Sequence, residues 1–176
     1  MLIFIGLGNP GEKYKNNRHN VGFILINYLI SHLDIQGVSV KTFEKFDSEI
    51  SEVVINNKKC LFVKPQSFMN NSGIVVKKIL DFFKKPIENL TVIHDDLYIP
   101  LVKFKIQNAS GPKLHNGILS IEQHLKTDNF KRIRIGIDSR NPQNNIDGET
   151  YVLSDFTKEE FIKLQEVLKK VERLVV

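Results

Sequence analysis

The chain has 176 residues, of which 41% are hydrophobic and 26% are charged, so we expect one globular domain over residues 1–176 and no extensive disorder. A single cysteine excludes an internal disulfide and a cysteine-rich metal site, and the formal charge of +5 permits a polyanionic partner without requiring one. No apolar run reaches the roughly 18 residues of a membrane span, and the first residues lack the basic start of a signal peptide, so we expect a cytoplasmic protein.

The first half of the chain alternates between strand and helix patterns. The apolar run 2–7 predicts a buried strand, the polar run 8–17 a loop, and residues 21–33 a buried helix. Two β-branched runs, 48–55 and 60–64, flank a polar segment and predict a hairpin. Helical spacing of apolar residues then predicts a helix over 72–83.

The second half continues the alternation. Residues 90–94 predict a strand that ends in two carboxylates, and residues 102–106 predict another strand. Asn116 is typical of an N-cap and predicts a helix to about residue 126. Alternating residues predict a strand over 132–138, and an amphipathic pattern predicts a helix over 157–174. Strands that alternate with helices indicate a layered α/β fold.

The first loop resembles a dinucleotide-binding fingerprint. Residues 6–11 read GLGNPG directly after the first strand, which fits G-x-G-x-x-G. A nucleotide site also needs a helix that opens within the glycines and an acidic residue some 20 positions later, and the chain has neither. Asn9 has two possible roles. It follows a buried strand at the place where α/β folds bind ligands, so it can bind a ligand, or its side chain can bond to the backbone of a turn.

Three of the five histidines stand at predicted element ends beside Asn or Asp, in His19-Asn20, His94-Asp95-Asp96 and His115-Asn116. A histidine can act as a general base near neutral pH, and a nearby carboxylate can orient it and stabilise its charged form. The alternative is that these residues cap helices or turns. No zinc-ligand spacing and no G-x-S-x-G elbow appears, so neither metal nor serine catalysis is expected.

Residues 65–73 read PQSFMNNSG, and they place two apolar side chains, Phe68 and Met69, in a loop before a helix. They form either a hydrophobic staple or an apolar shelf for a flat or acyl group. In the second case Asn70 can bind a carbonyl group or a water.

Taken together, several blocks resemble the bacterial-type peptidyl-tRNA hydrolase family. They are FIGLGNPG at 4–11 with Tyr14, RHNVGF at 18–23, KPQSFMNNSG at 64–73, HDDL at 94–97, HNG at 115–117, RIRIGI at 132–137 and YVLSDF at 151–156. The resemblance implies hydrolysis of the ester that joins a peptide or N-blocked amino acid to the 3′ end of tRNA. It also implies a monomeric α/β/α sandwich around a twisted mixed, mostly parallel sheet, without metal or cofactor.

The resemblance also implies roles for individual residues. His19 matches the general base that activates a water, and Asp95 matches the aspartate that supports it. Asn9, Asn70 and Asn116 match amides that bind substrate and water, with Asn9 also sensing the blocked amino group. The remaining matches concern the tRNA: Tyr14 and Phe68 at its 3′ end, Met69 in the same cleft, and Lys105 and Arg134 on phosphate.

Departures from the family pattern leave alternatives open. Residues 110–114 read SGPKL where the family has a glycine-rich loop, so the shape of the adjoining cleft is open, and Lys113 either adds a phosphate contact or is solvated. The chain also stops somewhat short for the family, which suggests a clipped C-terminus.

Two other functions remain: an RNA-binding module without catalysis, and a nucleotide-dependent oxidoreductase built on the first loop.

Overall fold

A computed structural model describes the chain except for residues 36–39, 113, 142, 144–145 and 176. Its strands form one mixed, seven-stranded sheet in the order β2-β3-β4-β1-β5-β7-β6. The strands are β1 (Leu2–Gly6), β2 (Lys41–Glu44), β3 (Ser48–Ile55), β4 (Lys58–Pro65), β5 (Leu90–Pro100), β6 (Phe104–Asn108) and β7 (Lys131–Asp138). The α-helices are α1 (Val21–Ile35), α2 (Ser72–Phe83), α3 (Asn116–Leu125), α4 (Gly148–Val152) and α5 (Lys158–Val175).

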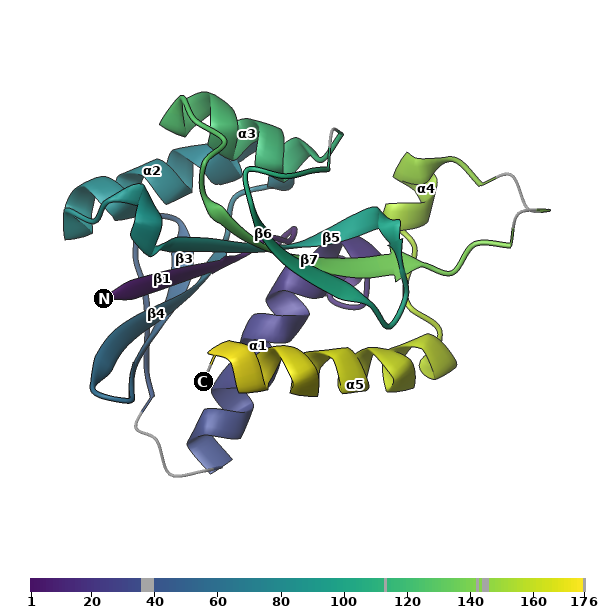
Figure 1. Cartoon of the computed structure of the whole chain (residues 1–176), viewed down its shortest axis with the longest axis horizontal. Coiled ribbons are helices and arrows are strands. Elements are labelled where there is room, and N and C mark those ends of the chain that lie inside the picture. The colour runs from purple at the N-terminus through teal and green to yellow at the C-terminus, as the bar shows by residue number, and fades with distance from the viewer. Residues whose placement is uncertain (36–39, 113, 142, 144–145, 176) are drawn as a thin grey trace.

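Helices cover both faces of the sheet, which confirms the α/β/α layering. Helices α1 and α5 lie on one face, where side chains such as Leu25 and Val167 are buried in one core. Helices α2 and α3 lie on the other face, where Ile79 and Ile121 are buried in a second core (Figure 1). Within the described residues, none of the helices combines the length and the apolar character needed to cross a membrane.

Parallel pairing is confined to the four central strands of the sheet. Strands β4, β1, β5 and β7 pair in parallel, and the outer pairs β2-β3, β3-β4 and β6-β7 are antiparallel. The sheet is therefore mixed, as expected, with the parallel part at its centre. Because parallel strands end at the same edge, the segments after β1, β4, β5 and β7 meet there, which is where open α/β sheets place their sites.

Most predicted elements are present, with differences at a few ends. Strand β5 runs on past the two carboxylates to Pro100, because Pro100 still pairs with Asp138 of β7 after a register shift. Strand β6 starts two residues later than predicted, since a turn with positive φ at Val102 precedes it. The hairpin turn is confined to Asn56 and Asn57, both with positive φ, as two-residue hairpin turns require.

A close contact between α1 and the sheet determines where the segment before this helix lies. A side chain on Gly22 would place its Cβ 2.4 Å from the backbone nitrogen of Leu7 and 2.6 Å from the carbonyl oxygen of Ile93. Only glycine allows this approach, because the obstructing atoms are backbone atoms. The short 3₁₀ helix η2 (Arg18–Asn20), just before α1, is thereby held beside the carboxyl ends of β1 and β5.

Candidate active site

A cleft of about 760 Å³ opens at the carboxyl ends of the central strands. Its walls come from segments that are far apart in the sequence: the loop after β1, η2, the loop after β4, the end of β5, the segment before α3, and α4. The polar residues that line it include Asn9, His19, Asn70, Asp95, His115, Asn116, Arg140 and Glu149. The apolar ones include Phe68, Met69, Leu97, Pro112, Leu114, Val152 and Leu153.

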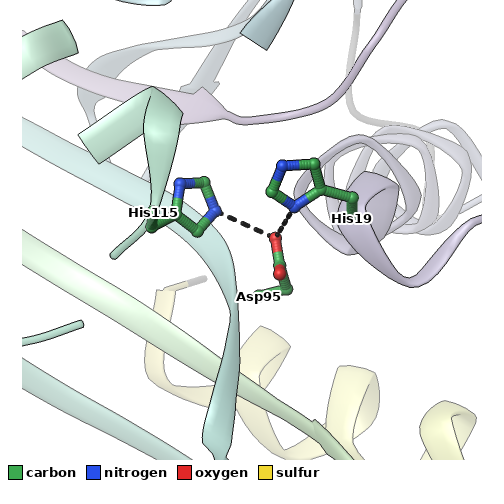
Figure 2. A group of neighbouring side chains, drawn as sticks. All are labelled: His19, Asp95 and His115. Carbon is green, nitrogen blue, oxygen red and sulfur yellow. Dashed lines mark hydrogen bonds and ion pairs between the residues drawn. The ribbon is translucent and has the colours of Figure 1, made fainter. Parts of the chain in front are cut away.

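Two histidine rings converge on one carboxylate oxygen at the base of this cleft. His19 Nδ1 lies 2.8 Å and His115 Nε2 lies 2.9 Å from Oδ1 of Asp95 (Figure 2). All three side chains are buried, and the two rings are tilted against each other with centroids 4.8 Å apart. A buried carboxylate with two ring N–H groups on one oxygen is a strongly organised polar cluster.

The other nitrogen of His115 determines the direction of these hydrogen bonds. His115 Nδ1 accepts the backbone N–H of Ile118 at 3.3 Å, so in the neutral ring the proton is on Nε2 and is donated to Asp95. His115 is therefore the N-cap of α3, and the prediction that Asn116 caps this helix is wrong. Asn116 is the first residue of the helix, and its side chain is exposed.

A similar argument orients the ring of His19. An ionised carboxylate only accepts, so His19 Nδ1 carries the proton that is donated to Asp95. In the neutral ring Nε2 is then unprotonated. Since His19 lines the cleft, this nitrogen is the basic atom available to a ligand there.

Burial and charge act in opposite directions on both partners. Burial raises the pKa of Asp95, but the charges and hydrogen bonds of His19 and His115 outweigh it and hold this pKa well below its usual range. Burial lowers the pKa of His19, but the charge of Asp95 and its hydrogen bond outweigh it, so this pKa lies above the ordinary 6.5. The pair therefore consists of an ionised aspartate and a histidine of increased basicity.

The third histidine of the sequence pattern, His94, lies behind this cluster. Its Nδ1 donates to the backbone carbonyl of Asp95 at 2.7 Å, and its ring meets that of His115 edge to face. Burial, together with the nearby His115, lowers the pKa of His94 to about 3, so the ring is neutral near pH 7. Its Nε2 has no hydrogen-bond partner among the described residues, and His94 does not line the cleft.

Asn9 is held in one orientation by two neighbouring segments. Its backbone exchanges two hydrogen bonds of 2.9 Å with the side chain of Asn20. Its side-chain oxygen accepts the backbone N–H of Met69, also at 2.9 Å. The amide group of Asn9 thus has its oxygen committed to the protein, which leaves Nδ2 as its donor.

The segment after β4 also contacts the start of α3. A Cβ on Gly117 would lie 2.6 Å from Sδ of Met69, so these two segments are in close contact. Met69 is buried there, while Asn70, Asn116 and Phe68 are exposed and line the cleft. The structure therefore gathers seven of the ten predicted site residues in one cleft.

Three of the predicted residues lie elsewhere. Tyr14 is half-buried on the short 3₁₀ helix η1 (Glu12–Tyr14), outside the lining of the cleft. Lys105 is exposed on β6 and lines a separate hollow of about 430 Å³ together with Lys103 and Lys170. Arg134 is nearly buried, and its Nη2 lies 2.7 Å from a carboxylate oxygen of Asp96.

The surroundings of Arg134 leave little of its charge for a ligand. Its Nε also donates to Asp96 at 2.8 Å, and Nη1 donates to Gln107 at 2.7 Å. Its guanidinium is thus committed within the protein, which disfavours the expected phosphate contact. Lys113, the other candidate for such a contact, lies outside the described residues.

The cluster of His19, Asp95 and His115 also has a composition that suits a metal ion, since its ligand atoms lie within 4.8 Å of one another. However, His19 Nδ1 and His115 Nε2 donate to Asp95, so an ion bound through these two nitrogens would have to displace both hydrogen bonds. The sequence marks His115 by its place beside Asn116 at the end of an element and by the HNG block at 115–117, but neither signal predicts a role for it in the site.

The comparisons with known proteins agree with one another. The sequence profile of the family described as peptidyl-tRNA hydrolase matches residues 3–176. The peptidyl-tRNA hydrolase of Aliarcobacter butzleri is 42% identical over 96% of this chain and 87% of its own length, and that of Bacillus subtilis is 41% identical over 97% and 87%. A crystal structure of peptidyl-tRNA hydrolase from Acinetobacter baumannii superposes with a TM-score of 0.80 at 28% identity, over 98% of this chain and 83% of that one. A peptidyl-tRNA hydrolase in complex with N-propanol gives a TM-score of 0.84 at 29% identity, over 99% and 88%.

Proposed function

The chain belongs to the peptidyl-tRNA hydrolase family, and we propose that it hydrolyses the ester between a peptide, or an N-blocked amino acid, and the 3′ end of tRNA. The observation that carries the mechanism is the 2.8 Å contact of His19 with Asp95 at the base of an amide-lined cleft. An ester hydrolase needs a base for water and donors for the oxyanion, and this cleft has both.

We assign the general base to His19. Its Nε2 removes a proton from a water as the water oxygen attacks the ester carbonyl carbon. The resulting tetrahedral intermediate collapses, the bond to the ribose oxygen breaks, and the imidazolium returns its proton to that leaving oxygen. Asp95 orients the ring through Nδ1 and stabilises its charged form, which agrees with the raised pKa of His19.

The amide donors of the cleft suit the developing negative charge. Asn9, whose side-chain oxygen is already occupied, presents Nδ2 and can donate to a substrate carbonyl or to the oxyanion. Asn70 and Asn116 have exposed side chains in the same cleft and can bind the peptide backbone and the attacking water. Neutral amides read the acyl group and backbone rather than a particular sequence, as an enzyme for many peptides requires.

His115 acts through Asp95. Its Nε2–H donates to the same carboxylate oxygen that accepts a hydrogen bond from His19, and its Nδ1 accepts the N–H of Ile118 in the first turn of α3. We therefore assign His115 as a positioning residue.

The tRNA is held by residues further from the reacting bond. We expect Phe68, exposed in the cleft, and Tyr14 on η1 to contact the 3′ end, with Met69 lining the same cleft. We expect Lys105, on the rim of the second hollow, to bind phosphate, which gives affinity without sequence preference. Arg134 instead holds Asp96. The catalytic set comes from one chain, and we expect a monomer.

A release assay tests the proposal directly. The protein is mixed with one tRNA carrying either N-acetylated or free aminoacyl groups, and the released amino acid is measured. We expect release from the blocked substrate only, and a loss of roughly 10³-fold or more in His19→Ala with an unchanged circular dichroism spectrum. Binding of the blocked substrate without release would favour an RNA-binding module, and equal cleavage of both substrates would contradict the role of Asn9.

A further inference from the structure

Leu114 is the most exposed large apolar side chain in the described part of the chain, yet it lines the cleft. Its exposed fraction is 81%, whereas its neighbours Pro112 and His115 are buried. Scattered exposed leucines are common on protein surfaces, but this one adjoins a residue that contacts Asp95. Its position therefore points to an interaction with a ligand in the cleft.

Two residues near Leu114, Gly111 and His115, are anchored by hydrogen bonds. On one side, the carbonyl of Gly111 accepts a hydrogen bond from Arg132 Nη1 at 2.6 Å. On the other side, His115 is fixed by Asp95 and by the N–H of Ile118. The exposed Leu114 is thus directly followed by an anchored residue, and Gly111, three positions before it, is anchored as well.

Leu114 and Asn116 flank the buried His115 in the sequence. His115 has φ −125° and ψ 110°, an extended conformation, and its ring contacts Asp95. Leu114 and Asn116 are both exposed and both line the cleft. Their Cα atoms are about 6–7 Å apart, which is about two residues of an extended peptide.

We propose that Leu114 is a specificity-determining residue that contacts the side chain of the amino acid nearest the ester and favours apolar residues there. This inference rests on the proposed function, in which Asn116 binds the acyl group or its backbone. An apolar substrate side chain next to that group would bury its surface against Leu114, with Leu153, 44% exposed in the same cleft, adding to the apolar surface. A base of the tRNA would stack better on an aromatic ring, and Phe68 offers one.

The test compares two blocked substrates on the same tRNA, one with N-acetyl-leucine and one with N-acetyl-glycine. In Leu114→Ser we expect kcat/KM for the leucine substrate to fall about tenfold and that for the glycine substrate to change less than about twofold. Leu114→Met should keep most of the wild-type kcat/KM for the leucine substrate. Leu174→Ser is the matched control, because Leu174 is 64% exposed on α5 and does not line the cleft.

The possible results separate the inference from the proposed function. An equal loss with both substrates would place Leu114 against the tRNA and overturn the inference, as would no loss at all. A wild-type protein that releases neither acyl group would refute the proposed function, and the assignment of Leu114 with it.

Discussion

Replacing Asp95 by asparagine tests the central feature of the site, because it removes one negative charge and keeps the shape. In the wild type, burial lowers the pKa of His19, and Asp95 raises it to above 6.5. Without the carboxylate, burial is unopposed and the pKa of His19 falls. Since the base acts only when neutral, the acidic limb of kcat/KM should move to lower pH in the variant.

The size of the rate loss follows from the geometry. At 2.8 Å and an effective dielectric constant of ~20, the attraction between Asp95 and a charged His19 ring is about 6 kcal/mol. Asparagine keeps a hydrogen bond to the charged ring of about 2 kcal/mol, so the transition state loses about 4 kcal/mol. That loss corresponds to a decrease of about 10³-fold in the plateau rate.

The assay is the release of N-acetyl amino acid from tRNA, measured between pH 5 and pH 9. Asp81→Asn is the matched control, because Asp81 is an exposed aspartate of α2 that contacts only Lys77 among the ion pairs of the described residues. The same change of charge at Asp81 should leave both the plateau rate and the pH dependence of kcat/KM unaltered. An unshifted acidic limb in Asp95→Asn, or a loss of less than about tenfold, would refute the assigned pair.

Three further predictions concern stability and RNA binding. The pKa of His94 is about 3 in the folded protein and about 6.5 in the unfolded chain, so between these values only the unfolded chain binds the proton. As the pH falls from 6.5 to about 3, the free energy of unfolding therefore decreases by about 1.4 kcal/mol for each pH unit. Urea unfolding of His94→Gln across this range should therefore show a shallower pH dependence than the wild type, and parallel curves would contradict the burial argument. Arg134→Met should destabilise the protein by about 3–5 kcal/mol, because it leaves a buried carboxylate unpaired. Lys105→Ala should leave the melting temperature unchanged, raise KM, and reduce the salt dependence of tRNA binding by about one ion. If Lys105→Ala and Arg134→Met raised KM equally, Arg134 would have to bind tRNA as well.

The fold was predictable where burial leaves a pattern in the sequence. Helix α2 and strand β3 have the predicted bounds because their apolar residues repeat with the period of the element. Strand β2 was missed because all four of its residues are exposed and it is held only by its pairing with β3. The extension of β5 was missed because polar residues continue the strand, paired with β7.

The site was predictable only in part, because the sequence shows residue types but no partners. Asn9, His19 and Asp95 stand at the ends of apolar elements that meet at one edge of the sheet, but position alone left turn and capping roles open, and the family resemblance selected them. The commitment of Arg134 to Asp96 could not be predicted, because the two residues are 38 positions apart and belong to neighbouring strands. An arginine in an alternating strand looks equally suited to phosphate or to a buried ion pair until its neighbour is known.

The three histidines show why the site had to be resolved at the level of single atoms. In the sequence each stands beside Asn or Asp, and in the structure each has a nitrogen bonded to Asp95: two at the carboxylate and one at the backbone carbonyl. Their second nitrogens differ. That of His115 accepts from the first turn of α3, and that of His94 is buried away from the cleft. Only His19 combines an aspartate on one nitrogen with an uncommitted nitrogen at the cleft, and for that reason we assign the base to His19.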